Sequence, residues 1–162
     1  NRAKAGRLSR LSGREYVKGG GEAGGGTRVA YLVGEGAITR GGGSDGITSG
    51  AMDRLLREVR DDASIKGVIL RIDSPGGDGI ASDDILFDVT ELSKRKPVVI
   101  SMSDVAASGG YFIAMNGSPI VAYPNTLTGS IGVYLTRPNL RGFYDKIGLQ
   151  KEILSRGKYA RI

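Results

Sequence analysis

The sequence contains no histidine and no cysteine in its 162 residues. These absences exclude a Ser/His/Asp triad completed within this chain, a cysteine nucleophile, disulfide bonds and the usual zinc ligands. A serine nucleophile in this chain would need a general base of another residue type, and lysine is the known alternative.

Long apolar runs and aromatic residues are also scarce. No apolar run approaches the roughly 20 residues that a membrane span requires, so we expect this piece not to cross a bilayer. Aromatic residues make up 6% of the chain, and no stacking-and-basic pattern indicates a nucleic-acid surface. The basic start has no apolar core and does not resemble a secretory signal, and the missing initiator Met fits a fragment of something longer.

The net charge of +6 is concentrated at the start of the chain. Residues 1–18 contain six basic side chains and one acidic side chain, Glu15, so they carry +5 of that total. Such a segment could contact an acidic surface, but we favour a solvated linker. Residues 1–26 are thus interpreted as a basic and then glycine-rich linker or extension, and residues 27–162 as one domain of ordinary composition, with 40% apolar and 25% charged residues.

Hydrophobic periodicity in the domain predicts an α/β fold. Apolar runs predict strands at 28–33 (extended by 37–39), 67–72, 97–102, 120–122, 131–135 and 151–154. Helical spacing predicts helices from Thr48 or Ser49 to about 61, and at 81–93, 108–115 and 140–147. A glycine-rich loop at 41–46 is either a mobile loop over a site or, as we favour, an insertion without a function. Strands separated by helices indicate crossovers and a mostly parallel sheet.

Two glycine turns directly follow predicted strands. They are Ser74-Pro75-Gly76-Gly77 and Ser108-Gly109-Gly110. Because sites in parallel sheets lie at the carboxyl ends of the strands, we expect both turns at one edge. The first lacks the spacing of a P-loop or a dinucleotide fingerprint; it suits a rigid shelf whose exposed amides bind an acyl oxygen or an extended peptide, although Pro-Gly-Gly is also a common structural turn.

Ser108 is the candidate nucleophile. It lies between two alanines and two glycines at a predicted strand-to-helix turn, which would expose its hydroxyl beside the free amides of a helix start. On these residues alone, the other interpretation is that Ser108 only caps the helix, since serine is a preferred N-cap residue.

Together these motifs resemble the signal peptide peptidase A family, also called protease IV, which has the Clp-protease/crotonase-like fold. The matching stretches are 67–82, 96–115, 127–133, 138–148 and 151–160. The resemblance implies a serine endopeptidase with Ser108 as nucleophile, the amides of Gly77 and Gly109 as the oxyanion hole, and Gly76 beside it.

The resemblance also implies where the general base lies. In the family's short form a lysine follows the last strand, and here Ala160 stands at that position. In the long form, of plant, algal and cyanobacterial type, two tandem halves divide the dyad. The chain thus resembles the serine-bearing C-terminal half, with lysine supplied by an absent N-terminal half. Lys158 is the alternative base within this chain, but it stands two residues from the family's position. Lys94 and Lys96 are expected to be helix C-terminal charges.

Partners and location follow from the same resemblance. It implies cleaved signal peptides or other hydrophobic peptides as substrates, a tetramer of tandem chains, and a membrane surface in the plastid thylakoid or at the bacterial inner membrane. It implies no metal ion and no organic cofactor, and no nucleic acid partner is expected. Two rival interpretations are a catalytically silent structural or peptide-binding half, and a crotonase-like acyl-coenzyme A enzyme, which gives no reason for the Ala-Ala-Ser-Gly-Gly run.

Overall fold

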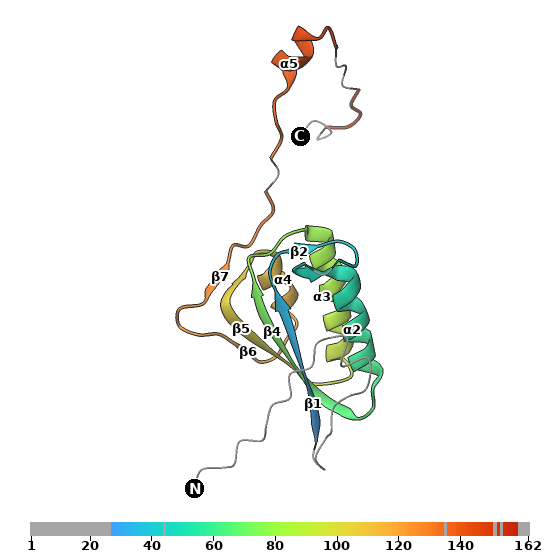
Figure 1. Ribbon diagram of the computed structural model, residues 1–162, viewed down its shortest axis with the longest axis vertical. Helices are drawn as coiled ribbons and strands as arrows, with labels where there is room; N and C mark the ends of the chain where they lie inside the picture. The colour runs from blue at the N-terminus through green and yellow to red at the C-terminus, as the bar shows by residue number, and fades with distance from the viewer. Residues whose placement is uncertain (1–26, 44, 135, 151, 153, 159–162) are drawn as a thin grey trace.

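The computed structural model describes residues 27–43, 45–134, 136–150, 152 and 154–158. Its centre is a parallel sheet with helices packed along one face (Figure 1). The strands, in the spatial order β1-β4-β5-β6, are β1 (Arg28–Glu35), β4 (Ile65–Ser74), β5 (Val98–Ala107) and β6 (Ile120–Val121), and β7 (Leu127–Gly129) also pairs with β5. This confirms the expected α/β class with a mostly parallel sheet.

The helices and a small second sheet complete the fold. The helices are α2 (Ser49–Asp61), α3 (Gly79–Ser93), α4 (Gly109–Ala114) and α5 (Arg141–Lys146). The second sheet pairs β2 (Ile38–Thr39) with β3 (Ile47–Thr48) in parallel. No helix in the described ranges combines the length and the apolar character that crossing a bilayer requires.

The core lies between the sheet and the helices. Alternate residues of the central strands, such as Leu70 and Ile100, are fully buried, and they pack with apolar residues of α2 and α3 such as Leu56 and Ile85. This alternation follows from the two-residue period of a strand. The other sheet face carries Tyr31, which is 43% exposed. The burial therefore fixes α2 and α3 to one face of the sheet.

Most predicted elements are confirmed, with one clear error. The strand predicted at 131–135 is wrong, because the described residues 131–134 are not in a strand; β7 instead begins four residues earlier. Apolar residues in this stretch suit a strand, but the described residues 131–134 pair with no neighbouring strand. Of the strand predicted at 151–154, Lys151 and Ile153 lie outside the described residues, and Glu152 and Leu154 are not in a strand.

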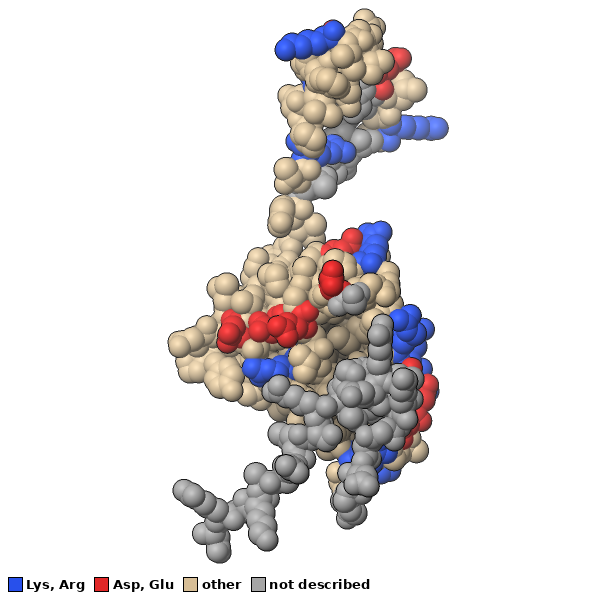
Figure 2. Space-filling model, in the orientation of Figure 1, with Lys and Arg blue, Asp and Glu red and all other residues tan. Residues whose placement is uncertain are grey.

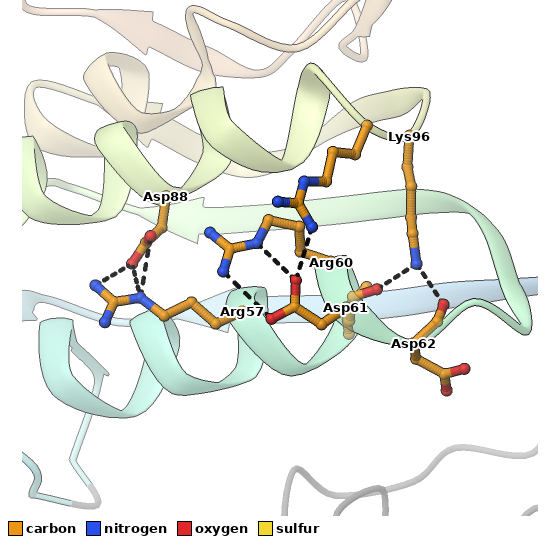
Figure 3. A network of polar contacts seen from close by, with 8 residues as sticks. Arg57, Arg60, Asp61, Asp62, Asp88 and Lys96 are labelled. Carbon is orange, nitrogen blue, oxygen red and sulfur yellow. Dashed lines mark hydrogen bonds and ion pairs between the residues drawn. The ribbon is translucent and has the colours of Figure 1, made fainter.

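Lys96 stabilises a different helix from the one expected. Its Nζ donates to the backbone carbonyls of Val59 and Asp62 at the end of α2, across from its own position after α3 (Figure 3). Lys94 pairs only with Glu91 on its own helix. Lys96 thus satisfies carbonyls that a helix end leaves free, and it connects α2 to the start of β5.

Candidate active site

Ser108 occupies a strained backbone conformation between β5 and α4. Its φ of 51° and ψ of −119° fall outside the regions that L-residues ordinarily adopt. Ser108 stands at the N-cap position of α4, but its side chain makes no capping hydrogen bond, so capping does not account for it. Strain of this kind costs about 1–3 kcal/mol and persists only where the surroundings impose it; a serine on a strained strand-to-helix turn is the geometry of a nucleophile elbow.

Backbone hydrogen bonds on both sides hold Ser108 in this conformation. Its N–H donates to the carbonyl of Gly129 in β7 at 2.8 Å, and its carbonyl accepts from the N–H of Phe112 in α4 at 2.9 Å. A side chain braces the preceding strand, since Asp73 Oδ1 accepts from the N–H of Val105 at 3.1 Å. The turn is thus fixed by β7, α4 and β4 together.

Gly76 packs directly against the Ser108 turn. A Cβ placed on Gly76 would lie 2.8 Å from Ser108 Cβ and 2.5 Å from the backbone nitrogen of Gly109, closer than real Cβ atoms come. The φ of Gly76 is also +94°, a conformation that suits glycine. The structure therefore confirms that the two glycine turns meet at one edge of the sheet, and it requires a glycine at position 76.

Gly77 directs its own backbone groups away from the fold. Ile38 in β2 bridges it in parallel, because the N–H of Ile38 donates to Gly76 O and the carbonyl of Ile38 accepts from Asp78 N. In this pattern the N–H and C=O of Gly77 point to the opposite side from Ile38. Gly77 is exposed, and within the described residues its N–H has no acceptor. This amide is free to bind an oxygen.

Gly109 supplies a second free amide beside Ser108. It is the first residue of α4, so its N–H has no intrahelical acceptor, and none is recorded in the described part of the chain. Gly109 is buried against Ser82, whose Oγ would lie 2.5 Å from a Cβ at this position. Among the described residues the N–H groups of Gly77 and Gly109 thus both lack an acceptor, and Gly109 directly follows Ser108, whose hydroxyl forms no hydrogen bond there.

The sequence analysis missed the residues that support these turns. Ser74 Oγ accepts from Gly76 N at 3.1 Å, and Ser82 Oγ donates to Asp78 O at 2.8 Å. Asp78 caps α3 by accepting from the N–H groups of Ile80 and Ala81. The hydrogen bond from Arg40, followed by these backbone bonds, lowers the pKa of Asp78. An aspartate before an apolar helical pattern is a capping signal that could have identified Asp78.

No base for Ser108 is present in the described part of the chain. No side chain there forms a hydrogen bond with Ser108 Oγ, and the Nζ of Lys96 is committed to carbonyls of α2. Lys158 belongs to the segment that leads away from the sheet after β7 (Figure 1). Acidic side chains lie over the ends of β1, β4 and β5 (Figure 2), where Glu35 is in register with Asp73. Ala160 lies outside the described residues.

The fold and this edge define an α/β protein with a serine on a strained strand-to-helix turn, flanked by free amides.

Comparison with known proteins gives the family. Residues 90–162 match the family model described as peptidase family S49. The chain is 46% identical over 144 residues to serine protease SPPA, chloroplastic, of Arabidopsis thaliana, a match that covers 86% of this chain and 21% of that protein. It is 40% identical over 130 residues to protease 4 of Haemophilus influenzae, covering 79% and 21%. The chain belongs to peptidase family S49, in its signal peptide peptidase A branch of plant type.

A solved structure supports the fold. The model superposes on a mutant of the 1510-N membrane-bound stomatin-specific protease with a TM-score of 0.54 at 22% identity, covering 70% of this chain and 53% of that one. At this identity the likeness concerns the fold alone. The chain spans about a fifth of the length of the two curated relatives named above, at 21% of each.

Proposed function

We propose that this chain is the serine-bearing part of a serine endopeptidase, with Ser108 as the nucleophile. The observation that carries the proposal is the strained backbone of Ser108, held between β7 and α4 with its hydroxyl uncommitted. Ser108 is half-buried and its hydroxyl forms no hydrogen bond among the described residues, and backbone strain at such a serine is typical of nucleophiles on strand-to-helix turns. The curated relatives are proteases by name, which supports the same reaction class.

In the proposed reaction Ser108 Oγ attacks the carbonyl carbon of a peptide bond while a neutral lysine takes its proton. The N–H groups of Gly77 and Gly109 stabilise the negative oxygen that forms, and removal of one such donor typically costs about 10²–10³ in rate. The lysine then gives the proton to the leaving amine, which leaves an acyl-enzyme on Ser108. Water, deprotonated by the same lysine, attacks the acyl-enzyme and restores the serine.

We propose that the lysine comes from an N-terminal half of the same longer protein. Two observations support this origin: no basic side chain of the described residues contacts Ser108 Oγ, and alanine stands at position 160. A lysine must be neutral to act as the base, so its pKa must fall from about 10.4 towards the working pH. Burial at a junction between two halves would lower it by desolvation.

The proposed substrates are cleaved signal peptides or other hydrophobic peptides, bound extended beside Gly77. The exposed main chain of Gly77 supports this binding mode, because its N–H and C=O face away from Ile38 and remain available for strand-like pairing. We place the whole protein at a membrane surface, in the plastid thylakoid or at the bacterial inner membrane, as a tetramer of tandem chains; the name of the chloroplastic relative supports the plastid.

A second candidate function is a catalytically silent half that binds peptides or holds the assembly together. The absence of a base at Ser108 among the described residues favours it for the isolated chain. It leaves the strained backbone of Ser108 without a purpose, so we prefer the peptidase.

Labelling with a fluorophosphonate serine probe tests the proposal. The 162-residue chain and a longer protein that includes the N-terminal half would be compared, each beside Ser108→Ala and Lys158→Ala. We expect labelling of the longer protein only, lost in Ser108→Ala and kept in Lys158→Ala. Labelling of the 162-residue chain that Lys158→Ala abolishes would show an internal dyad, and no labelling of either form would favour the silent half.

A further inference from the structure

A groove between α2 and α3 lies outside the candidate active site. It is open, has a volume of about 280 Å³, and is lined by Asp53, Arg57, Asp83, Asp84 and Phe87. Neither the sheet edge nor the glycine turns contribute to it. Its lining belongs to the outer sides of two helices, which in a folded domain usually carry scattered charges of both signs.

Carboxylates outnumber basic groups in this groove. Asp88 is buried and pairs with Arg57 (Figure 3), with NH2 of Arg57 2.9 Å from Oδ2 of Asp88. Asp83 and Asp84 are exposed and form no ion pair within the described ranges. The buried Oδ1 of Asp53 has no hydrogen-bond partner there. Arg57 thus pairs with Asp88, and the exposed carboxylates of Asp83 and Asp84 remain available to a cation.

Large apolar side chains lie beside these carboxylates on α3. Ile80 is 57% exposed and Phe87 is 61% exposed. They are seven residues apart, so they lie on one face of the helix two turns from each other, with Asp83 and Asp84 between them. The groove therefore presents an apolar and acidic strip, which fits a segment that alternates basic and apolar side chains.

Such a segment precedes the domain in this chain. Residues 1–18 carry +5, and Leu8 and Leu11 stand among their arginines. The glycine-rich residues 19–26 connect this segment to β1, and eight residues extend to about 26 Å. Arg28 pairs with Ile65, which follows α2 closely, so β1 starts near the end of α2. From that end the groove is about 12 Å away along the helix, since eight residues separate Asp61 from Asp53. The connection is long enough to reach the groove.

We propose that the basic segment, residues 1–18, docks in the groove between α2 and α3 of its own chain. Its arginines contact Asp83 and Asp84, and its leucines cover Phe87 and Ile80. Charge complementarity and the reach of the connection carry the proposal, which does not depend on the peptidase activity. The groove then anchors the segment that enters the domain.

Paramagnetic relaxation can test this docking, because the chain has no native cysteine and a single Ser9→Cys accepts one nitroxide label. In the 162-residue chain we expect loss of the amide signals of Asp83, Asp84 and Phe87 at low ionic strength. The signals should recover in salt, since the Debye length falls from about 10 Å at 0.1 M to about 3 Å at 1 M. They should also recover in the double variant Asp83→Lys, Asp84→Lys.

The control is Glu58→Lys with Asp145→Lys, which changes the net charge equally at other exposed positions. The signal loss should survive in this control. Three results would overturn the proposal: uniform broadening over the whole surface, broadening centred on other residues, and signal loss that persists in the variant Asp83→Lys, Asp84→Lys. Broadening that appears only when an unlabelled chain is mixed with a labelled one would identify a second copy as the occupant and would also overturn it.

Discussion

Replacing Ser108 with glycine should make the domain more stable, although it removes the candidate nucleophile. The φ of 51° and ψ of −119° cost about 1–3 kcal/mol for a residue with a Cβ, and glycine adopts positive φ without that cost. Glycine also increases the entropy of the unfolded chain. This lowers the free energy of unfolding by about 0.4–1 kcal/mol and offsets part of the gain. Ser108→Gly should therefore unfold with a free energy about 0.5–2 kcal/mol higher than that of Ser108→Ala, which keeps the Cβ and the strain.

Thermal and denaturant unfolding measure this difference. For a domain of this length, 1 kcal/mol corresponds to about 2–4 °C in Tm. Ala107→Gly is the matched control, because Ala107 lies in β5 with an ordinary backbone, and glycine there should destabilise by about 0.5–1 kcal/mol. If Ser108→Gly is no more stable than Ser108→Ala, the backbone of Ser108 stores no strain and our reason for assigning it as a nucleophile fails.

Three further predictions concern other residues of the domain. Gly76→Ala should lower the free energy of unfolding by about 2 kcal/mol in chemical denaturation, because its Cβ would meet Ser108 and Gly109. Gly79→Ala is the control and should be neutral or stabilising, because a Cβ on Gly79 has nothing within 4 Å. Equal effects of the two substitutions would contradict the packing of Gly76. Burial and then Asp88 raise the pKa of Asp53 to about 6, so its ionised form costs stability above pH 6. After discounting for solvent screening, Asp53→Asn should raise the free energy of unfolding by about 1 kcal/mol at pH 8 and leave it unchanged below about pH 4. Denaturant unfolding at a series of pH values measures this difference, and a stabilisation independent of pH would contradict the prediction. Lys96→Ala should cost about 1 kcal/mol and Lys94→Ala almost nothing in the same assay, and the reverse order would refute the capping of α2.

Local pattern predicts much of the fold, and tertiary pairing explains where it fails. The apolar periodicities predict α2, α3 and the central strands, and the rule for parallel sheets predicts that both glycine turns share an edge, as the contact of Gly76 with Ser108 confirms. The bridge from Ile38 to Gly77 could not be predicted, because it joins segments that are far apart in sequence. The position of β7 was not predicted either, since its pairing with β5 joins residues that are far apart in sequence.

Charges in the groove show the same limit. Helical spacing places Asp88 among the apolar residues of α3, and only the packing of α2 against α3 brings Arg57 to it. The unpartnered Oδ1 of Asp53 likewise follows from the way the helices meet. Sequence can predict that a helix is amphipathic, but it does not say which charges on two helices become neighbours.

The hydrogen bond from Ser108 N–H to Gly129 O has a practical consequence for fragment design. It makes β7 part of the support of Ser108, although β7 is only three residues long and follows α4 by more than ten residues. A fragment that ends before Leu127 would keep the serine, both glycine turns and nearly the whole buried core, but it would release the amide of Ser108. A minimal fragment that keeps the backbone of Ser108 fixed must therefore extend at least through Gly129, and cloning boundaries drawn at the last buried residue would remove this support without removing the fold.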